Sequence, residues 1–153
     1  MKIKPGPVSR RTPVYEVQAH HVASVIQQLA DACARQFGGG TELSLEDFYR
    51  FSDLPEYKRF MEATIVCGFV CTDYGSAFPL TKVNDRPNEV IPTLPFSKVR
   101  HYIHTLQRAE KWNSEYSTAL WTAITNGALL LVARDRSQVS CRKKWVKGCL
   151  NFG

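Results

Sequence analysis

The stretch SKVRHYIHTLQRAEKWNSEYSTALWTAITNGALLLVA, residues 97–133, decides the fold expected of this chain. Apolar side chains recur at helical spacing over residues 99–106, and Ser97 is a suitable cap for the helix that contains them. Lys111-Trp112-Asn113 is expected to form a turn, because Ser114 can cap another helix directly after it. Two successive helices are therefore predicted here.

The second of these helices is expected to end at Asn126-Gly127, since glycine readily adopts the left-handed conformation that closes a helix. The apolar run 128–133 predicts a buried strand, and residues 138–146 predict a basic strand that pairs back with it. Helix, turn, helix and hairpin follow one another as in a winged helix-turn-helix. We therefore predict an α+β fold with a winged-helix-like C-terminal half.

The N-terminal half adds three predicted helices and three short strands. The helices are expected over residues 22–37, from Ser44, and from Pro55 to Gly68, and the strands over 14–17, 69–72 and 77–81. Prolines 87, 92 and 95 predict a loop over residues 84–95. The expected core is Val25, Ile26, Leu29, Phe48, Phe60, Phe69, Tyr102, Ile103, Leu106, Leu120, Ile124, Leu130 and Val132.

The length of 153 residues suits one domain, since domains commonly hold about 100–150 residues. Residues 1–13, with three prolines and four cations, are expected to form a flexible basic segment, and residues 14–153 one globular domain. No apolar run reaches the roughly 18 residues of a membrane span, and no signal peptide is recognised. Five irregularly spaced cysteines are expected to be reduced, mostly buried thiols of a cytoplasmic protein.

Positive charge is concentrated at the two ends of the chain. Residues 1–13 carry four cations and no acid, and residues 134–147 carry six cations and one acid, within a net charge of +6. The middle of the chain is therefore mildly acidic. Such segregation indicates a polyanionic partner if both basic ends gather on one face of the fold.

The helix over residues 97–112 has cations and histidines at its polar positions. The helix after it carries none, which argues against reading bases in a major groove. Contact with a nucleic-acid backbone is expected instead, with Trp112 or Trp145 available for stacking, although Trp112 is expected rather to be a packing residue and the role of Trp145 stays open. The predicted nucleic-acid-binding residues are Lys98, Arg100, His101, His104, Arg108 and Lys111 on the helix, and Arg142, Lys143, Lys144 and Lys147 in the tail.

His101 and His104 stand three residues apart on one helix, a spacing at which two histidines can share a metal. No standard zinc spacing supplies further ligands, so no metal or other cofactor is expected. Cys67, Cys71, His101 and Asp73 can be combined on paper as a nucleophilic set, but no catalytic motif accompanies them. An enzyme is therefore not expected.

Two stretches resemble an uncharacterised bacterial and phage family, a domain of unknown function. Leu54-Pro55-Glu56-Tyr57-Lys58-Arg59-Phe60, running into Cys67-Gly68-Phe69-Val70, is similar to that family's Pro-aromatic helix and Gly-Phe turn. Residues 99–133 are similar to its helix, basic aromatic link, second helix, glycine stop and apolar strand. The resemblance implies a bacterial, plasmid or phage source and a small protein that acts by binding.

The leading hypothesis is a non-catalytic bacterial or mobile-element binding protein that engages nucleic acid or a nucleic-acid-handling complex, without a membrane partner. One alternative is a protein inhibitor of a bacterial defence system such as a CRISPR complex, which the acidic middle of the chain permits. The second alternative is a small nuclease, in which His101 and His104 act as acid and base and Lys98 or Arg100 clamps a phosphate.

Overall fold

The structure is a computed structural model that describes residues 6–38, 44–112 and 118–139, with the side chains of 135–139 left aside. These residues form eight α-helices and one 3-10 helix, and no sheet is present among them. The elements are α1 (Glu16–Phe37), α2 (Leu45–Ser52), α3 (Pro55–Val66), α4 (Leu80–Asn84), α5 (Pro87–Val90), η1 (Ile91–Thr93), α6 (Phe96–Trp112), α7 (Ala119–Thr125) and α8 (Ala128–Val139).

The fold is all-α, so the predicted α+β class and the winged-helix-like half are wrong. The apolar run 128–133 forms the first turns of α8 rather than a strand. A short continuous apolar run fits a buried helix as well as a buried strand, and alanine and leucine favour the helix. Gly127, at φ 84°, ends α7, and α8 starts at the next residue. The end of this helix at Asn126-Gly127 was therefore predicted correctly, whereas the strand predicted after it was wrong.

The other predicted strands also fail within the described residues. Residues 14–17 run into α1, residues 69–72 make only an isolated bridge, and residues 77–81 run into α4. The expected loop 84–95 contains α5 and η1. Of the predicted basic strand 138–146, only residues 138 and 139 are described, and both are in α8.

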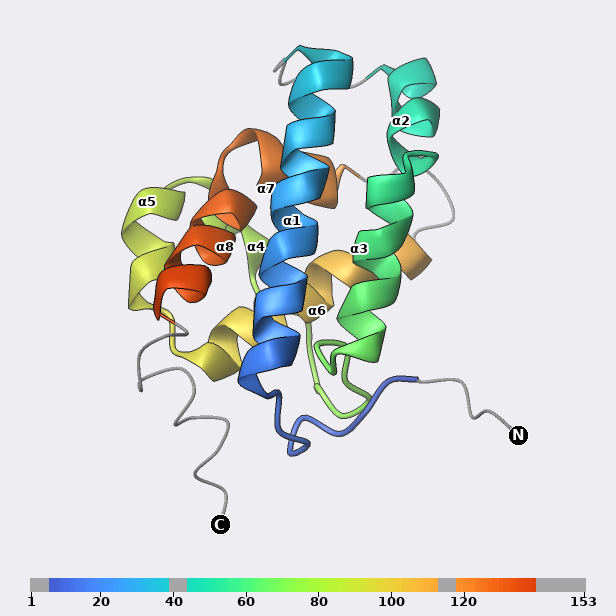
Figure 1. The fold of residues 1–153 in the computed structure, drawn as a ribbon. Helices are drawn as coiled ribbons and strands as arrows, with labels where there is room; N and C mark the ends of the chain where they lie inside the picture. The colour runs from blue at the N-terminus through green and yellow to red at the C-terminus, as the bar shows by residue number, and fades with distance from the viewer. Residues whose placement is uncertain (1–5, 39–43, 113–117, 140–153) are drawn as a thin grey trace, which may run out of the picture.

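The helix α1 lies at the centre of the fold. Figure 1 shows it between α8 on one side and α3 on the other, and these two helices make its most extensive contacts. The helix α6 crosses behind α3 and contacts both α3 and α7. The buried apolar face predicted over residues 22–37 therefore serves as the central packing surface.

The predicted core is largely confirmed. Phe48 and Leu130 are only partly buried, and the other expected core residues are buried. An aromatic cluster joins the helices at one end of this core: the ring centroid of Trp121 lies 5.3 Å from that of Phe37 and 5.4 Å from that of Phe51. These edge-to-face contacts hold α1, α2 and α7 together.

The predicted start of α2 is confirmed. Ser44 is its N-cap, and its hydroxyl accepts a hydrogen bond from the backbone N of Asp47 at 3.1 Å. This bond satisfies one of the backbone N–H groups that the first turn of a helix leaves without an internal partner.

Residues 8–12, called here the N-terminal strap, lie against the segment that follows α3. Val8 N donates to Val70 O at 3.1 Å, and Thr72 N donates to Val8 O at 2.9 Å. This pairing forms a parallel bridge between Val8 and Cys71. Of the segment 1–13, which was expected to be flexible, the strap thus has defined backbone partners, and residues 1–5 lie outside the described residues.

Within the described parts of the chain, no helix combines the length and the apolar character needed to cross a membrane.

Candidate nucleic-acid interface

Arg100 lies where the N-terminal strap, the end of α3 and the helix α6 meet. Its Nε donates to Gly68 O at 2.9 Å, and its Nη1 donates to Arg10 O at 2.8 Å. Its Nη2 lies 3.5 Å from Ser9 O. The residue is only 4% exposed, and no described carboxylate forms an ion pair with it. Arg100 was predicted to contact nucleic acid, but its guanidinium is occupied inside the fold.

Gly68 makes this arrangement possible. Its φ of +82° lies in the left-handed region that favours glycine. A Cβ at this position would come within 3.8 Å of Arg100 Nη2 and of a methyl group of Val8. The glycine that stops α3 therefore also directs its carbonyl towards the guanidinium.

His101 is held by a turn and by an aromatic ring. Its Nε2 lies 2.7 Å from Ser76 O, and because that oxygen can only accept, the ring donates from Nε2. The imidazole stacks on Tyr74, with ring centroids 4.0 Å apart and the planes at 9°. Both interactions fix the ring against the segment that precedes α4.

His104 is held by a backbone amide. Its Nδ1 accepts a hydrogen bond from Cys71 N at 3.1 Å, so this nitrogen carries no proton. Burial, together with the smaller effects of the Arg108 and His101 charges, lowers the pKa of His104 to about 4. The side chain is therefore neutral near pH 7 and supplies no charge to a phosphate.

Cys71 does not have the surroundings of a reactive thiol. It is 3% exposed, and burial raises its pKa, against the opposite effects of Arg100 and of a hydrogen bond with Tyr74. A thiol with a raised pKa is a poor nucleophile because little thiolate forms near pH 7.

Within the described residues, no group of three or more His, Cys, Asp and Glu side chains is placed to hold a metal ion.

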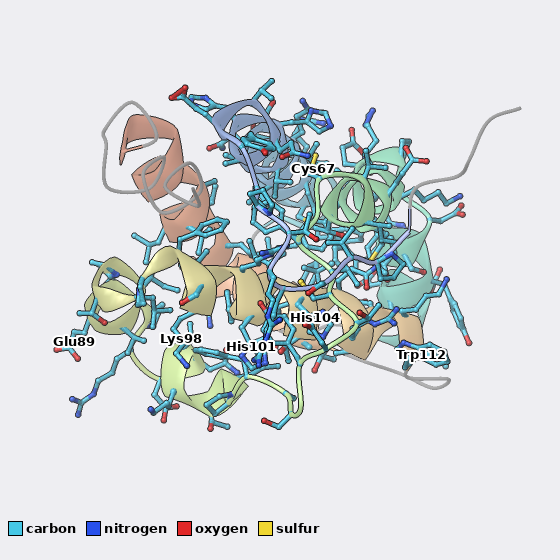
Figure 2. The ribbon with its side chains drawn as sticks, turned by 90° about the horizontal axis from the view of Figure 1, so that it is seen from below. Cys67, Glu89, Lys98, His101, His104 and Trp112 are labelled. Atoms are coloured by element: carbon cyan, nitrogen blue, oxygen red, sulfur yellow. The ribbon has the colours of Figure 1, made fainter. Side chains whose placement is uncertain are left out.

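The remaining predicted residues of α6 lie on one face of the helix. At about 100° per residue, residues 98, 101, 104, 108, 111 and 112 fall within less than half of the helix circumference. Figure 2 shows Lys98, His101, His104 and Trp112 following one another along α6. This surface is called here the α6 polar face: Lys98, His101, His104, Arg108, Lys111 and Trp112.

The end of the α6 polar face combines cations with an exposed indole. Lys111 is exposed, and Trp112 is 70% exposed. The guanidinium carbon of Arg108 lies 5.3 Å from the centroid of the Trp112 ring. Trp112 therefore presents a flat apolar surface to solvent, with positive charge beside it.

The structure adds two residues to this surface that were absent from the predicted set. The guanidinium carbon of Arg10 lies 6.0 Å from the ring centroid of Tyr74, which in turn stacks on His101. Arg10 Nε also lies 4.0 Å from a carboxylate oxygen of Asp73, an exposed contact that neutralises part of its charge. The cluster of cations in residues 1–13 was the only sequence signal for Arg10, and nothing in the sequence indicated Tyr74.

The predicted tail residues Arg142, Lys143, Lys144 and Lys147 lie outside the described residues, as does Trp145. Of the C-terminal basic end, residues 134–139 are described and form the last turns of α8, with Arg134 exposed, whereas the N-terminal strap lies beside the α6 polar face.

Comparison with protein-family models, with curated proteins and with solved structures found no match to this chain. The resemblance to a bacterial and phage family of unknown function therefore stays a prediction.

Proposed function

We propose that this protein is a non-catalytic binding protein that contacts nucleic acid through the α6 polar face and Arg10. The observation that carries the proposal is the exposed Trp112, which is stacked beneath Arg108 and adjoins Lys111. A large exposed aromatic ring among cations is the combination that proteins use to bind single strands, because bases stack on the ring while the cations neutralise phosphates.

Three cations of this surface are available to phosphates. Lys98 and Lys111 are exposed, and neither forms an ion pair with any described residue. Arg10 is exposed at the strap and has one long, solvent-facing contact with Asp73. Binding through such groups releases counterions and therefore weakens as the salt concentration rises.

The positions of the histidines favour binding over catalysis. An acid–base pair needs ring nitrogens that can reach a substrate and exchange protons near pH 7. His101 directs Nε2 to Ser76 O, and His104 uses Nδ1 for Cys71 N with its pKa lowered to about 4. We therefore do not assign them a nuclease role, and no arrangement of the described residues favours an inhibitor of a defence complex.

The state of the cysteines indicates the cellular compartment in which the protein works. The described cysteines Cys33, Cys67 and Cys71 are free and buried, as expected from the sequence. Free thiols suit a reducing compartment, so we place the protein in the cytoplasm, where nucleic acid is accessible.

Fluorescence anisotropy with a labelled single-stranded oligonucleotide tests the function. Binding should weaken about twentyfold between roughly 50 mM and 200 mM salt, as expected for about three phosphate contacts to a single strand. Lys111→Ala should weaken binding several-fold, whereas Arg35→Ala should leave it unchanged. Arg35 is an exposed cation at the far end of α1 and makes the variant a matched control for the loss of one charge.

Absence of binding at low salt, or binding that does not respond to salt, would overturn the proposal. Capture from a bacterial lysate with and without nuclease treatment adds a second readout. Capture of a partner that survives nuclease treatment, together with absent oligonucleotide binding, would point to the inhibitor alternative.

A further inference from the structure

Segment 69–74, which follows α3, joins the N-terminal strap to α6. The strap pairs with this segment on both sides of Cys71, because Val8 N donates to Val70 O and Thr72 N donates to Val8 O. The backbone N of Cys71 itself donates to His104 Nδ1 at 3.1 Å. One short stretch of backbone therefore connects the strap to an imidazole of α6.

The hydrogen bond between Cys71 N and His104 Nδ1 exists only while that nitrogen carries no proton. A protonated imidazole donates from both ring nitrogens, so its Nδ1–H would face the N–H of Cys71 and neither group could accept. Cys71 is buried, and a buried N–H without an acceptor is costly. Protonation of His104 therefore works directly against the contact that holds segment 69–74 on α6.

The groups on α6 also oppose a charge on His104. Burial is the largest cause of its lowered pKa of about 4, and Arg108 and His101 contribute in the same direction. The ring centroid of His101 lies 6.2 Å from that of His104. Arg100, one turn earlier on α6, adds a buried cation to the same junction. His104 therefore binds a proton more readily once its ring has left these surroundings, and acid favours that state by linkage.

Segment 69–74 and the strap bring further polar groups to this junction. The ring centroid of Tyr74 lies 4.7 Å from that of His104, and the guanidinium carbon of Arg10 lies 6.0 Å from the Tyr74 centroid. Asp73 supplies a carboxylate, which accepts hydrogen bonds from Arg10 N and Ser9 Oγ. Asp73 and the strap are therefore bonded to each other, so they can move as one unit when segment 69–74 leaves α6.

We propose that segment 69–74 is an acid-sensitive latch: protonation of His104 releases it from α6, together with the N-terminal strap. Opening removes the carbonyl of Arg10 as the acceptor for Arg100 Nη1, so the guanidinium that the closed form buries becomes accessible. The opening is local, because α1 keeps its extensive packing against α3 and α8. This switch does not depend on the proposed function, and it adds an open form to the closed one that the structure describes.

Hydrogen exchange followed by mass spectrometry tests the latch, with rates corrected for the intrinsic effect of pH. With a pKa of about 4 in the closed form and 6.5 in the open form, the opening equilibrium should rise about thirtyfold between about pH 7.5 and pH 5. Peptides that contain residues 8–12 and 70–72 should show this rise, and they should be less protected than α1 at every pH. His104→Gln keeps an acceptor that does not titrate and should reduce the rise to less than about threefold.

His21→Gln is the matched control, since His21 is exposed, and it should keep the full rise. If His104→Gln does not fold, nuclear magnetic resonance of the wild type replaces it: the amide signals of Val8 and Thr72 should shift with the same midpoint as the His104 imidazole. The same acid response in the wild type and His104→Gln, or a separate midpoint for the strap, would overturn the latch. Equal protection of the strap and α1 would also overturn it, because the strap would then open only by global unfolding.

Discussion

The guanidinium of Arg100 in α6 donates from Nη1 to the backbone carbonyl of Arg10, 2.8 Å away, across ninety positions of the chain. With its bond to Gly68 O, it ties the N-terminal strap and the end of α3 to one side chain. A buried cation is costly unless its donors are satisfied, and here backbone carbonyls satisfy them in place of a described carboxylate. Arg100 therefore stabilises a junction between distant segments.

Arg100→Ala is expected to lower the free energy of unfolding by about 3 kcal/mol, because hydrogen bonds to a charged donor are lost and carbonyls are left buried without partners. Urea denaturation followed by circular dichroism measures the change. Arg100→Lys should recover only part of the loss, since an ammonium group cannot direct donors along the planar fork of a guanidinium. Arg35→Ala is the control, because Arg35 is exposed. A stability of Arg100→Ala equal to that of the control would contradict this role.

Asp73 also holds the N-terminal strap, through Ser9 and Arg10. It accepts hydrogen bonds from Arg10 N at 2.8 Å and from Ser9 Oγ at 3.0 Å. These bonds, the first of them above all, lower the pKa of Asp73. Their stabilising effect is therefore present above the ordinary pKa of the carboxyl and is lost as the pH falls through the lowered value.

Asp73→Ala is expected to loosen the strap without unfolding the domain. Hydrogen exchange measured by mass spectrometry should become faster in peptides that contain residues 8–12 and 70–72, and should stay unchanged in α1. Asp85→Ala removes an exposed carboxylate outside this junction and should leave the exchange of the strap unchanged. Equal exchange in the two variants would show that Asp73 does not hold the strap.

His104 makes stability depend on pH. In the folded protein its pKa is lowered to about 4, whereas in an unfolded chain it lies near 6.5. Between pH 4 and pH 6.5 the unfolded chain binds more protons than the folded protein does. The contribution of His104 to the free energy of unfolding is therefore fully present above pH 6.5 and is lost progressively as the pH falls towards 4. Protonation of Nδ1 would also break the bond from Cys71 N.

His104→Gln should flatten this part of the pH profile, because glutamine can accept a bond from the Cys71 amide but does not titrate. Thermal unfolding of the wild type and the variant at several pH values between 4 and 7 measures the effect. His21→Gln is the matched control, since His21 is exposed, and it should retain the profile of the wild type. If His104→Gln kept the pH dependence of stability seen in the wild type, His104 would be ruled out as the source of that dependence.

The helices with a one-sided apolar pattern could be predicted from sequence, and the element after Gly127 could not. In α1, apolar residues alternate with polar ones at a period that only a helix satisfies. Residues 128–133 are apolar on every side, so their period does not distinguish a helix from a strand, although alanine and leucine favour the helix. In the structure they form the start of α8, which packs on α1.

The site could be predicted in part for a similar reason. The spacing of Lys98, Arg108 and Lys111 on one helix indicates their shared face directly. The burial of Arg100 depends on carbonyls of Arg10 and Gly68, which lie far from it in sequence. No local pattern distinguishes a cation that binds backbone carbonyls from one that faces solvent, so only the folded chain separates Arg100 from its neighbours.

The exposed indole of Trp112 provides the most direct readout of the proposed interface. If a base stacks on it, addition of a single strand should quench its fluorescence, and Trp112→Ala should weaken binding by about tenfold, since one base–aromatic stack contributes about 1–3 kcal/mol. Trp121 is 3% exposed and packed between Phe37 and Phe51, so it should not respond. Trp112→Phe retains a smaller stacking surface, so its affinity should fall between those of the wild type and Trp112→Ala. Unchanged binding by Trp112→Ala, with Lys111→Ala still weakened, would limit the interface to phosphate contacts and remove stacking from the mechanism.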